Sequence, residues 1–202
     1  MTLLLIRHGE TDFNAGRIVQ FPDTPLGSNG LVQAESLGRH MAGRAVSLVL
    51  SSDYQRALST AERVAAHTGA PLRTSALLRE RNFGDLRGRP YADFGPLDIF
   101  AADYQPPNGE SWSDFNARVD AAWREVLAIS ADIDGEVAVV THGLVLRSLC
   151  ERVLDLGQHG VPGEITVANT AVTIVERMPP WRVRDFACVA HLADGARDVA
   201  PV

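Results

Sequence analysis

Short apolar runs alternate with segments of helical periodicity along the first third of the chain. Apolar runs occupy residues 3–6 and 46–50, and apolar residues at helical spacing follow them over 31–41 and 57–65. A continuous apolar run is typical of a buried strand, whereas spacings of three and four residues are typical of a helix with one apolar side. The pattern therefore predicts the order strand, helix, strand, helix.

The same alternation returns in the last third of the chain. It predicts a strand at 137–140, a helix at 144–154 and two further strands at 171–175 and 181–185. A Met-Pro-Pro sequence separates the last two strands, which we expect to form an antiparallel hairpin at one edge of the sheet. Strands that alternate with helices indicate an α/β fold, here a three-layer α/β/α sandwich with a mostly parallel central sheet.

Residues 87–111 interrupt this alternation. The segment is rich in glycine, proline, aspartate and aromatic residues, and residues 104–111 have the composition of a loop. In open α/β sheets, ligand sites form beyond the carboxyl ends of the strands. We therefore predict that 87–111 is a lid-like insertion over the end of the sheet that carries the active site.

The composition narrows the classes of function. A chain of 202 residues with 46% apolar residues suits a single domain, which we place over residues 1–202. The net charge is −6 and the basic residues are dispersed, so we expect neither a nucleic-acid partner nor a membrane partner. The sequence has no lysine, which excludes a P-loop lysine, a Schiff-base lysine and a lysine general base.

The cysteines and the first residues favour a cytoplasmic location. Cys150 and Cys188 lie in apolar surroundings without metal-ligand spacing, which indicates buried thiols in a reducing compartment. The apolar run before Arg7 has four residues, too few for the core of a signal peptide. No later run approaches the roughly 20 residues that a membrane span needs.

Three predicted strand ends carry arginine or imidazole side chains. Arg7 and His8 follow the first strand, Arg56 lies in the first turn of a predicted helix, and His142 and Gly143 lie between a strand and a helix. If neighbouring strands bring these places together, two guanidinium groups, two imidazoles and two helix N-termini converge. That combination suits a tetrahedral dianion such as a phosphoryl group.

These groups predict phosphoryl transfer with a histidine nucleophile. Arginine stabilises a transferred phosphoryl group without a metal, so we expect no metal and no cofactor. Neutral imidazole is a nucleophile, and two nearby arginines should keep His8 unprotonated near neutral pH. The leaving oxygen needs a proton, and Glu80 is the best-placed acid because it follows a strand candidate at 71–77.

The order and spacing of these residues resemble the histidine phosphatase superfamily, also called the phosphoglycerate mutase-like superfamily. The resemblance covers at least residues 3–150 and includes Arg7-His8-Gly9-Glu10-Thr11, Asn14, Arg56, Glu80 before Phe83-Gly84, and His142-Gly143. It implies a phosphoglycerate mutase-like fold with a phosphohistidine at His8. It also implies that Glu80 protonates the leaving group and then activates water. The groups that would bind the phosphoryl group are Arg7, Asn14, Arg56, His142 and Gly143.

Two departures from the family pattern bear on the substrate. Val19 and Gln20 stand where the family often has a small polar pair, and no arginine occurs between Tyr91 and Ser111. Phosphoglycerate mutases of this superfamily carry a basic cluster in the corresponding insertion, which grips the carboxylate of phosphoglycerate. The absence of positive charge from this segment favours the phosphatase branch. We therefore expect a metal-independent phosphomonoester hydrolase that acts on a small phosphorylated metabolite.

The sequence alone also allows other functions. A cofactor-dependent phosphoglycerate mutase would interconvert 2- and 3-phosphoglycerate. A non-catalytic module that binds a phosphorylated ligand could share the fold, although it would not need the proton donor Glu80. Activity as a phosphoprotein phosphatase is less compatible with the insertion at 87–111, because this segment would restrict the access of a protein substrate to the active site. The physiological substrate and the number of subunits are not determined, and a homodimer is one option.

Overall fold

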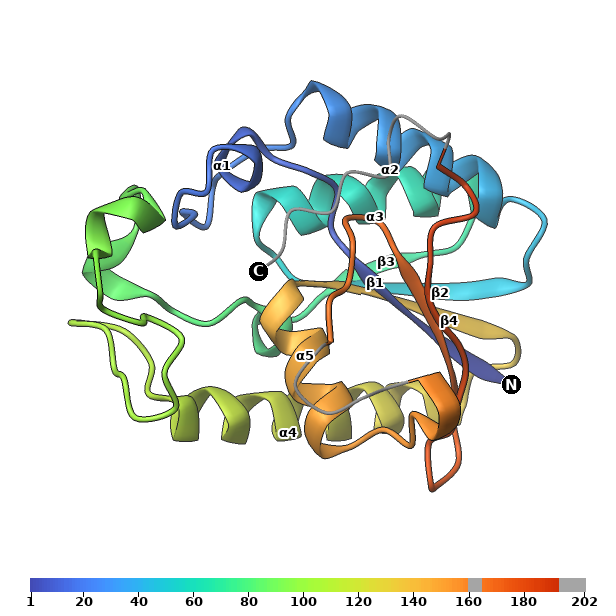
Figure 1. The fold of residues 1–202 in the computed structure, drawn as a ribbon. Helices are drawn as coiled ribbons and strands as arrows, with labels where there is room; N and C mark the ends of the chain where they lie inside the picture. The colour runs from blue at the N-terminus through green and yellow to red at the C-terminus, as the bar shows by residue number, and fades with distance from the viewer. Residues whose placement is uncertain (160–164, 193–202) are drawn as a thin grey trace.

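A six-stranded sheet forms the centre of the computed structural model, which describes residues 1–159 and 165–192 (Figure 1). The strand order is β3-β2-β4-β1-β5-β6. The first four strands in this order run parallel, and β5 and β6 are antiparallel to their neighbours. The strands are β1 (Thr2–Arg7), β2 (Val46–Ser51), β3 (Leu72–Thr74), β4 (Glu136–Thr141), β5 (Val172–Glu176) and β6 (Val183–Cys188).

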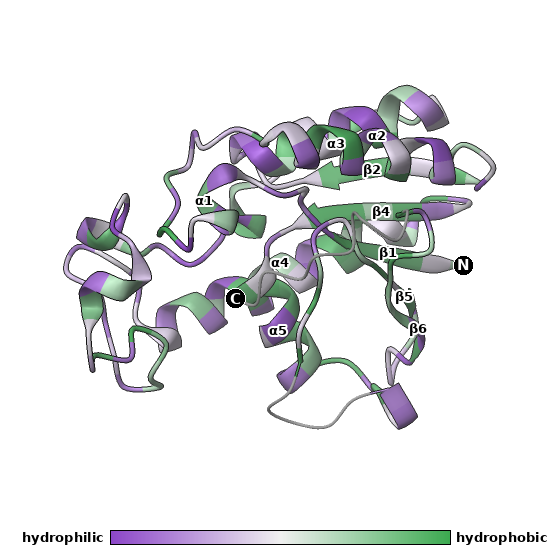
Figure 2. Cartoon of the chain, turned by 45° about the horizontal axis from the view of Figure 1, so that its top comes forward, coloured by the Kyte–Doolittle hydropathy of each residue, from purple (hydrophilic) through white to green (hydrophobic). Residues whose placement is uncertain are grey.

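Helices cover both faces of the sheet, as Figure 2 shows. One face packs against α2 (Ser28–Met41) and α3 (Gln55–Thr68), and the other packs against α4 (Trp112–Ala131) and α5 (Gly143–Arg152). Side chains of a strand alternate between the faces, so Leu3 of β1 joins the core beneath α4 and α5 whereas Leu4 joins the core beneath α2 and α3. The predicted three-layer α/β/α sandwich with a mostly parallel sheet is therefore confirmed.

Several predicted boundaries shift. The strand expected at 71–77 is limited to β3, because β3 pairs with β2 alone and the chain then turns into the short 3₁₀ helix η1 (Ala76–Leu78). The hydroxyl of Ser75 accepts a hydrogen bond from the Leu77 N–H and so caps this turn. The predicted hairpin exists as β5 and β6, although β6 begins later than the expected 181.

The segment 87–111 projects beyond the end of the sheet in Figure 1, where it is drawn in green. It contains the 3₁₀ helix η3 (Tyr91–Phe94) and follows η2 (Gly84–Leu86). The buried Arg81 guanidinium holds the segment by donating to the carbonyl oxygens of Ile99 and Tyr104, and it lies 4.1 Å from the ring centroid of Trp112. The remaining short helices are α1 (Asp12–Ala15) and η4 (Gly157–His159).

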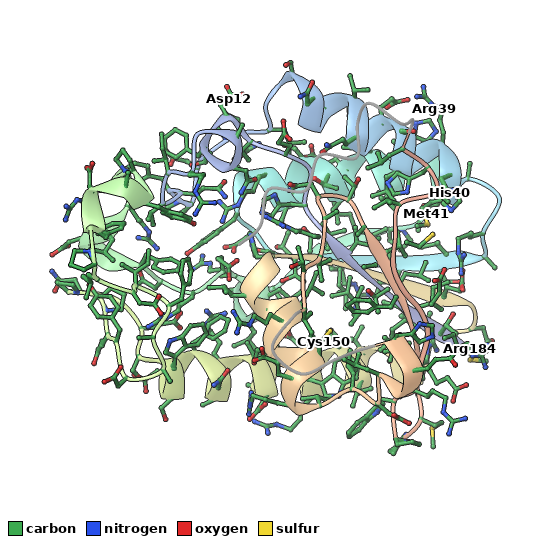
Figure 3. All side chains as sticks on the ribbon, in the orientation of Figure 1. Asp12, Arg39, His40, Met41, Cys150 and Arg184 are labelled. Carbon is green, nitrogen blue, oxygen red and sulfur yellow. The ribbon has the colours of Figure 1, made fainter. Side chains whose placement is uncertain are left out.

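Cys150 and Cys188 are free thiols. Cys150 is buried on α5, where Figure 3 labels it, and its burial raises the pKa of the thiol to about 12. Cys188 is half-buried at the end of β6. Within residues 1–159 and 165–192, no helix has the length and apolar character to cross a membrane.

Candidate active site

The carboxyl ends of three parallel strands meet at one edge of the sheet. Arg7 of β1 pairs with Thr141 of β4, and the His8 N–H donates to the Thr141 carbonyl oxygen at 3.0 Å. Directly after β2, the Ser52 N–H donates to the Val140 carbonyl oxygen at 3.0 Å. These backbone contacts bring together the three places at which the sequence predicted functional side chains.

Two hydrogen bonds determine which nitrogen of His8 carries the lone pair. His8 Nδ1 lies 2.7 Å from the Gly9 carbonyl oxygen, which can only accept, so Nδ1 carries the proton. Arg56 Nε then donates to Nε2 at 3.2 Å. The unprotonated nitrogen, the atom that could attack phosphorus, therefore faces the Arg56 guanidinium.

Burial and positive charge keep both site histidines neutral. Burial lowers the pKa of His8 well below its usual value, and repulsion from Arg56 and Arg7 adds to the effect. Burial is also the largest cause of the lowered pKa of His142, and Arg56 is the charged group with the largest effect on it. The centroids of the two rings are 5.2 Å apart. His142 Nε2 lies 2.8 Å from Ser52 Oγ, and its Nδ1 has no hydrogen-bond partner among the described residues.

Arg7 and Arg56 are buried cations whose side chains are oriented by backbone carbonyl groups. Arg7 Nη1 donates to the Val167 carbonyl oxygen at 2.6 Å, and Arg56 Nη1 donates to that of Phe21 at 2.9 Å. Burial lowers the pKa of Arg56 to about 10, so the group stays charged at neutral pH. Two fixed cations in a shielded position can stabilise a dianion more strongly than cations in water.

Glu80 is a buried carboxyl group with a raised pKa. Its Oε1 accepts from the Arg81 N–H at 2.9 Å, and its Oε2 accepts from the Leu144 N–H at 3.2 Å in the first turn of α5. Burial raises the pKa of Glu80, and the two backbone donors and the site arginines oppose this shift without cancelling it. A carboxyl group with a raised pKa can donate a proton at a pH where an exposed one is ionised.

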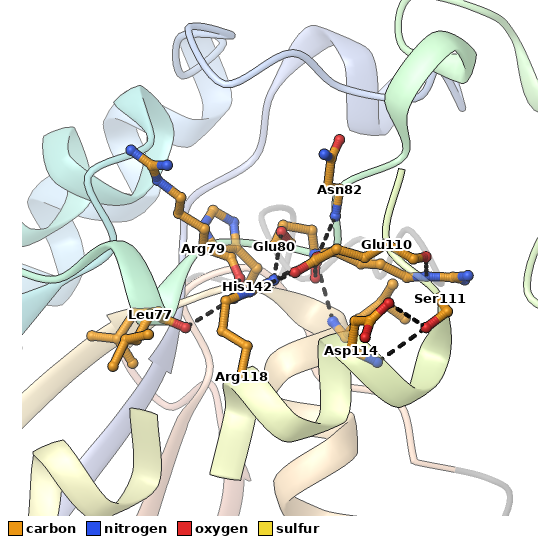
Figure 4. Close-up of polar contacts among 12 residues, drawn as sticks. Leu77, Arg79, Glu80, Asn82, Glu110, Ser111, Asp114, Arg118 and His142 are labelled. Carbon is orange, nitrogen blue, oxygen red and sulfur yellow. Dashed lines mark hydrogen bonds and ion pairs between the residues drawn. The ribbon is translucent and has the colours of Figure 1, made fainter. Parts of the chain in front are cut away.

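Arg118 of α4 holds the backbone that carries Glu80, as Figure 4 shows. Its guanidinium donates to the carbonyl oxygens of Leu77 at 2.8 Å, Arg79 at 2.7 Å and Glu80 at 3.2 Å. Both oxygens of Glu110 accept from the same guanidinium at 2.8 Å. Helix α4 therefore fixes the loop between η1 and η2 through one side chain.

Helix α2 holds the loop that follows β1. The Glu10 N–H donates to Gln33 Oε1 at 2.9 Å, and the Glu10 carboxylate accepts from Asn29 Nδ2 at 3.1 Å. The helix approaches so closely that a Cβ added at Gly30 would lie 1.9 Å from the Glu10 carbonyl oxygen. The contacts of Glu10 thus lead to α2, so the carboxylate anchors the loop that carries His8.

One pocket collects most of the predicted site residues. Asn14 and Gly143 line it, and Asn14 also closes a capping box with Thr11 at the start of α1. His142 lies beside the pocket, in ring contact with His8 and Tyr54. The lining residues are Arg7, His8, Phe13, Asn14, Arg17, Val19, Gln20, Tyr54, Arg56, Glu80, Arg81, Phe83, Arg87, Tyr91, Phe100, Gly143 and Leu144.

Sequence reasoning missed several residues of this pocket. Arg17, Arg87 and Tyr54 line it, although none belongs to the groups that the strand ends identified. The predicted lid contributes Tyr91 and Phe100. A signal for Tyr54 was available, because it lies between the end of β2 and Arg56, whereas nothing in the local pattern places Arg17 or Arg87 at this site.

No group of three or more histidine, cysteine, aspartate or glutamate side chains in the described part of the chain has the geometry of a metal site. The protein is thus an α/β/α sandwich whose pocket contains a histidine between two arginines. The model of the histidine phosphatase superfamily (branch 1) matches residues 3–183, and the chain belongs to that superfamily.

Individual relatives carry phosphatase and mutase names. The chain is 29% identical over 191 residues to "Probable phosphoglycerate mutase GpmB" of Yersinia pestis (strain Pestoides F), which covers 90% of this chain and 87% of the relative. The structure of a mycobacterial glucosyl-3-phosphoglycerate phosphatase is similar with a TM-score of 0.79 and 28% identity, covering 92% of this chain and 98% of the other. A phosphoglycerate mutase from Bacillus anthracis has a TM-score of 0.72 and 27% identity, covering 87% of each chain.

Proposed function

We propose that this chain is a metal-independent phosphomonoester hydrolase that works through a phosphohistidine at His8. The observation that carries the proposal is the tautomer of His8. Its Nδ1 donates a hydrogen bond to the Gly9 carbonyl oxygen, so the unprotonated Nε2 faces Arg56 in the pocket. A neutral, oriented imidazole between two cations is suited to in-line attack on phosphorus. The substrate is a small phosphorylated metabolite.

In the first step, His8 Nε2 forms a bond to phosphorus and the bond to the leaving oxygen breaks. Glu80 gives its proton to that oxygen, which leaves as an alcohol. Arg7 and Arg56 stabilise the phosphoryl oxygens, and His142, Asn14 and the N-terminus of α5 at Gly143 provide further binding groups.

In the second step, water attacks the phosphohistidine. The Glu80 carboxylate accepts a proton from this water, the bond between Nε2 and phosphorus breaks, and inorganic phosphate leaves. The raised pKa of Glu80 serves both steps, because the same group must hold a proton in the first and accept one in the second.

The direct test is release of inorganic phosphate from a panel of phosphomonoesters in the presence of EDTA. We expect release by the wild type and a loss of more than about a thousandfold in His8→Ala, because the covalent step then has no nucleophile. His159→Ala is the matched control, since His159 is an exposed histidine on η4. Equal activity of wild type and His8→Ala would refute the proposal.

A phosphoglycerate mutase is the second candidate, and the GpmB relatives favour it. A mutase would convert 3-phosphoglycerate to 2-phosphoglycerate with little release of phosphate and would depend on a bisphosphate primer. Following both products in the same reaction separates the two activities. If neither appears with any substrate, a module that only binds a phosphorylated ligand becomes the better description.

A further inference from the structure

The candidate pocket contains more positive charge than a phosphoryl group requires. Among the described lining residues there are five arginines and one carboxyl group, Glu80. Arg7 and Arg56 together match the two negative charges of a phosphoryl dianion. Arg81 is engaged elsewhere, because its guanidinium donates to three backbone carbonyl groups near the insertion. Two cations, Arg17 and Arg87, remain without a role in the proposed reaction.

A short antiparallel pairing fixes both of these arginines to the pocket. The Tyr91 N–H donates to the Arg17 carbonyl oxygen at 2.8 Å, and the Val19 N–H donates to the Arg89 carbonyl oxygen at 3.0 Å. The Gly88 N–H closes the pairing on the Val19 carbonyl oxygen at 2.7 Å. Segment 17–19 is thereby tied to segment 88–91, with Arg17 at one end of the pairing and Arg87 directly before its other end.

Neither side chain is neutralised within the described residues. The Arg17 guanidinium lies over the Tyr91 ring, 5.5 Å from the centroid, and forms no ion pair there. Arg87 Nη2 has a long contact of 3.4 Å with Tyr54 Oη and likewise has no carboxylate partner among those residues. Uncompensated cations in a concave pocket create a positive potential that favours anions.

Arg87 lies on the side of the pocket where a leaving group would sit. A second hollow adjoins the first, and Tyr54, Glu80 and Arg87 line both. Because Glu80 must face the leaving oxygen to protonate it, the residues that share its wall face the alcohol part of the substrate. The other arginines of the second hollow are paired, Arg79 with Asp53 and Arg118 with Glu110.

We infer that Arg87, assisted by Arg17, binds a second anionic group on the substrate. The preferred substrate is then a phosphomonoester whose alcohol part carries a carboxylate or another phosphate. This inference rests on the proposed function. It also weakens the sequence argument that a lack of arginine at 91–111 disfavours a substrate with a second anionic group. Residues outside that segment supply positive charge to the same pocket.

The test compares substrates that differ in one charged group. D-3-Phosphoglycerate and glycerol 3-phosphate share a three-carbon skeleton and a primary phosphate ester, and only the first has a carboxylate. Glucose 1,6-bisphosphate and glucose 6-phosphate form the second pair and distinguish a phosphate from a carboxylate as the second anion. The measured quantity is kcat/KM for phosphate release within each pair.

We expect the wild type to prefer the more anionic member of at least one pair and Arg87→Gln to reduce that preference by about tenfold, the range of a lost charged hydrogen bond. Arg17→Gln should reduce it further in the double variant. Arg89→Gln is the matched control, because Arg89 is exposed, lies over Phe94 and is absent from the pocket lining.

Two outcomes would overturn the inference while leaving the hydrolase proposal intact. One is a wild type that hydrolyses both members of each pair equally. The other is an Arg87→Gln variant that loses activity by the same factor on both members, which would mean that Arg87 serves the scissile phosphoryl group. Absence of hydrolysis in the wild type with every substrate would instead contradict the proposed function.

Discussion

At the scale of single residues, the proposed chemistry depends on groups whose protonation is set by burial. His8 and His142 have lowered pKa values and Glu80 has a raised one, and in all three burial is the largest cause. The surrounding arginines lower the pKa of the histidines further and oppose the shift of Glu80. A neutral nucleophile and a protonated acid can therefore coexist in a pH range where exposed groups would both be charged.

Glu80→Gln should separate proton donation from phosphoryl binding. We expect kcat/KM to fall by about 10²- to 10⁴-fold for an alkyl phosphate and far less for p-nitrophenyl phosphate, whose leaving group needs no proton. An equal loss on both substrates would remove Glu80 from the acid role. Asp85→Asn, which changes an exposed carboxylate near the same loop, is the control.

The pH dependence of kcat/KM follows from the same shifts. The first step requires unprotonated His8, whose pKa is lowered, and protonated Glu80, whose pKa is raised. Activity on an alkyl phosphate should therefore fall as the pH rises through the pKa of Glu80 and persist on the acid side of the usual histidine range. We expect the alkaline decline to disappear in Glu80→Gln, because glutamine does not titrate. The substrate's own ionisation is the same with both enzymes and therefore cannot cause a difference between them. A decline unchanged in Glu80→Gln would assign it to another group.

At the scale of secondary-structure elements, three strands supply the site and two helices keep it in place. Strands β1, β2 and β4 end beside one another, so the pairing of the strands is enough to make the residues that follow them neighbours. Helix α2 holds the His8 loop through Glu10, and helix α4 holds the Glu80 loop through Arg118. The proposed nucleophile and the proposed acid are thus supported from opposite faces of the sheet.

Arg118→Met should displace Glu80, because it removes the guanidinium that holds the backbone carbonyl group of Glu80. We expect kcat/KM for an alkyl phosphate to fall by about tenfold or more, with a smaller loss for p-nitrophenyl phosphate, because misplacing a catalytic group is costly. Arg152→Met is the matched control: it removes an ion pair of 2.7 Å between Arg152 and Asp120 of the same helix α4. If Arg118→Met changed the melting temperature but left the ratio of the two substrates unaltered, Arg118 would have a structural role alone.

At the scale of the whole molecule, His191, which follows β6, contacts α2 and the segment that precedes β5. The His191 carbonyl oxygen accepts from Ser36 of α2, and His191 Nε2 lies 2.9 Å from Thr170 Oγ1. The Thr170 N–H donates to the Arg7 carbonyl oxygen at 3.0 Å. Asn169 Nδ2 donates to the His8 carbonyl oxygen at 2.8 Å. The last described residues therefore contribute to the support of the active-site edge.

His191 should make the stability of the fold depend on pH. Burial, with a contribution from His40, lowers the pKa of His191 to about 4, so between that value and about 6.5 the unfolded chain binds more protons. Its stabilising effect is complete above about pH 6.5 and declines as the pH falls toward 4. Thermal unfolding of wild type and His191→Asn at pH 7.5 and pH 5 should show a smaller loss in the variant. Parallel losses would contradict this assignment.

The sequence alone determined the layer architecture and predicted which strand ends would lie together at the candidate site. Alternating apolar runs and helical stripes suffice for this, because a strand buried on both faces and a helix with one apolar side each leave a local pattern. Residues that follow strands at one edge, such as His8 and His142, could be placed together because parallel strands align their carboxyl ends. The strand predicted at 71–77 was too long, since its pairing stops after three residues.

Only the tertiary structure decided which distant side chains serve the same pocket. Arg17 and Arg87 reach it through a pairing between segments about 70 residues apart, and Arg118 reaches the Glu80 loop from a helix 38 residues further along the chain. Local patterns carry no information on such contacts, because they depend on how separate elements pack. The tautomer of His8 was decided in the same way, by the carbonyl group of Gly9 and the guanidinium of Arg56.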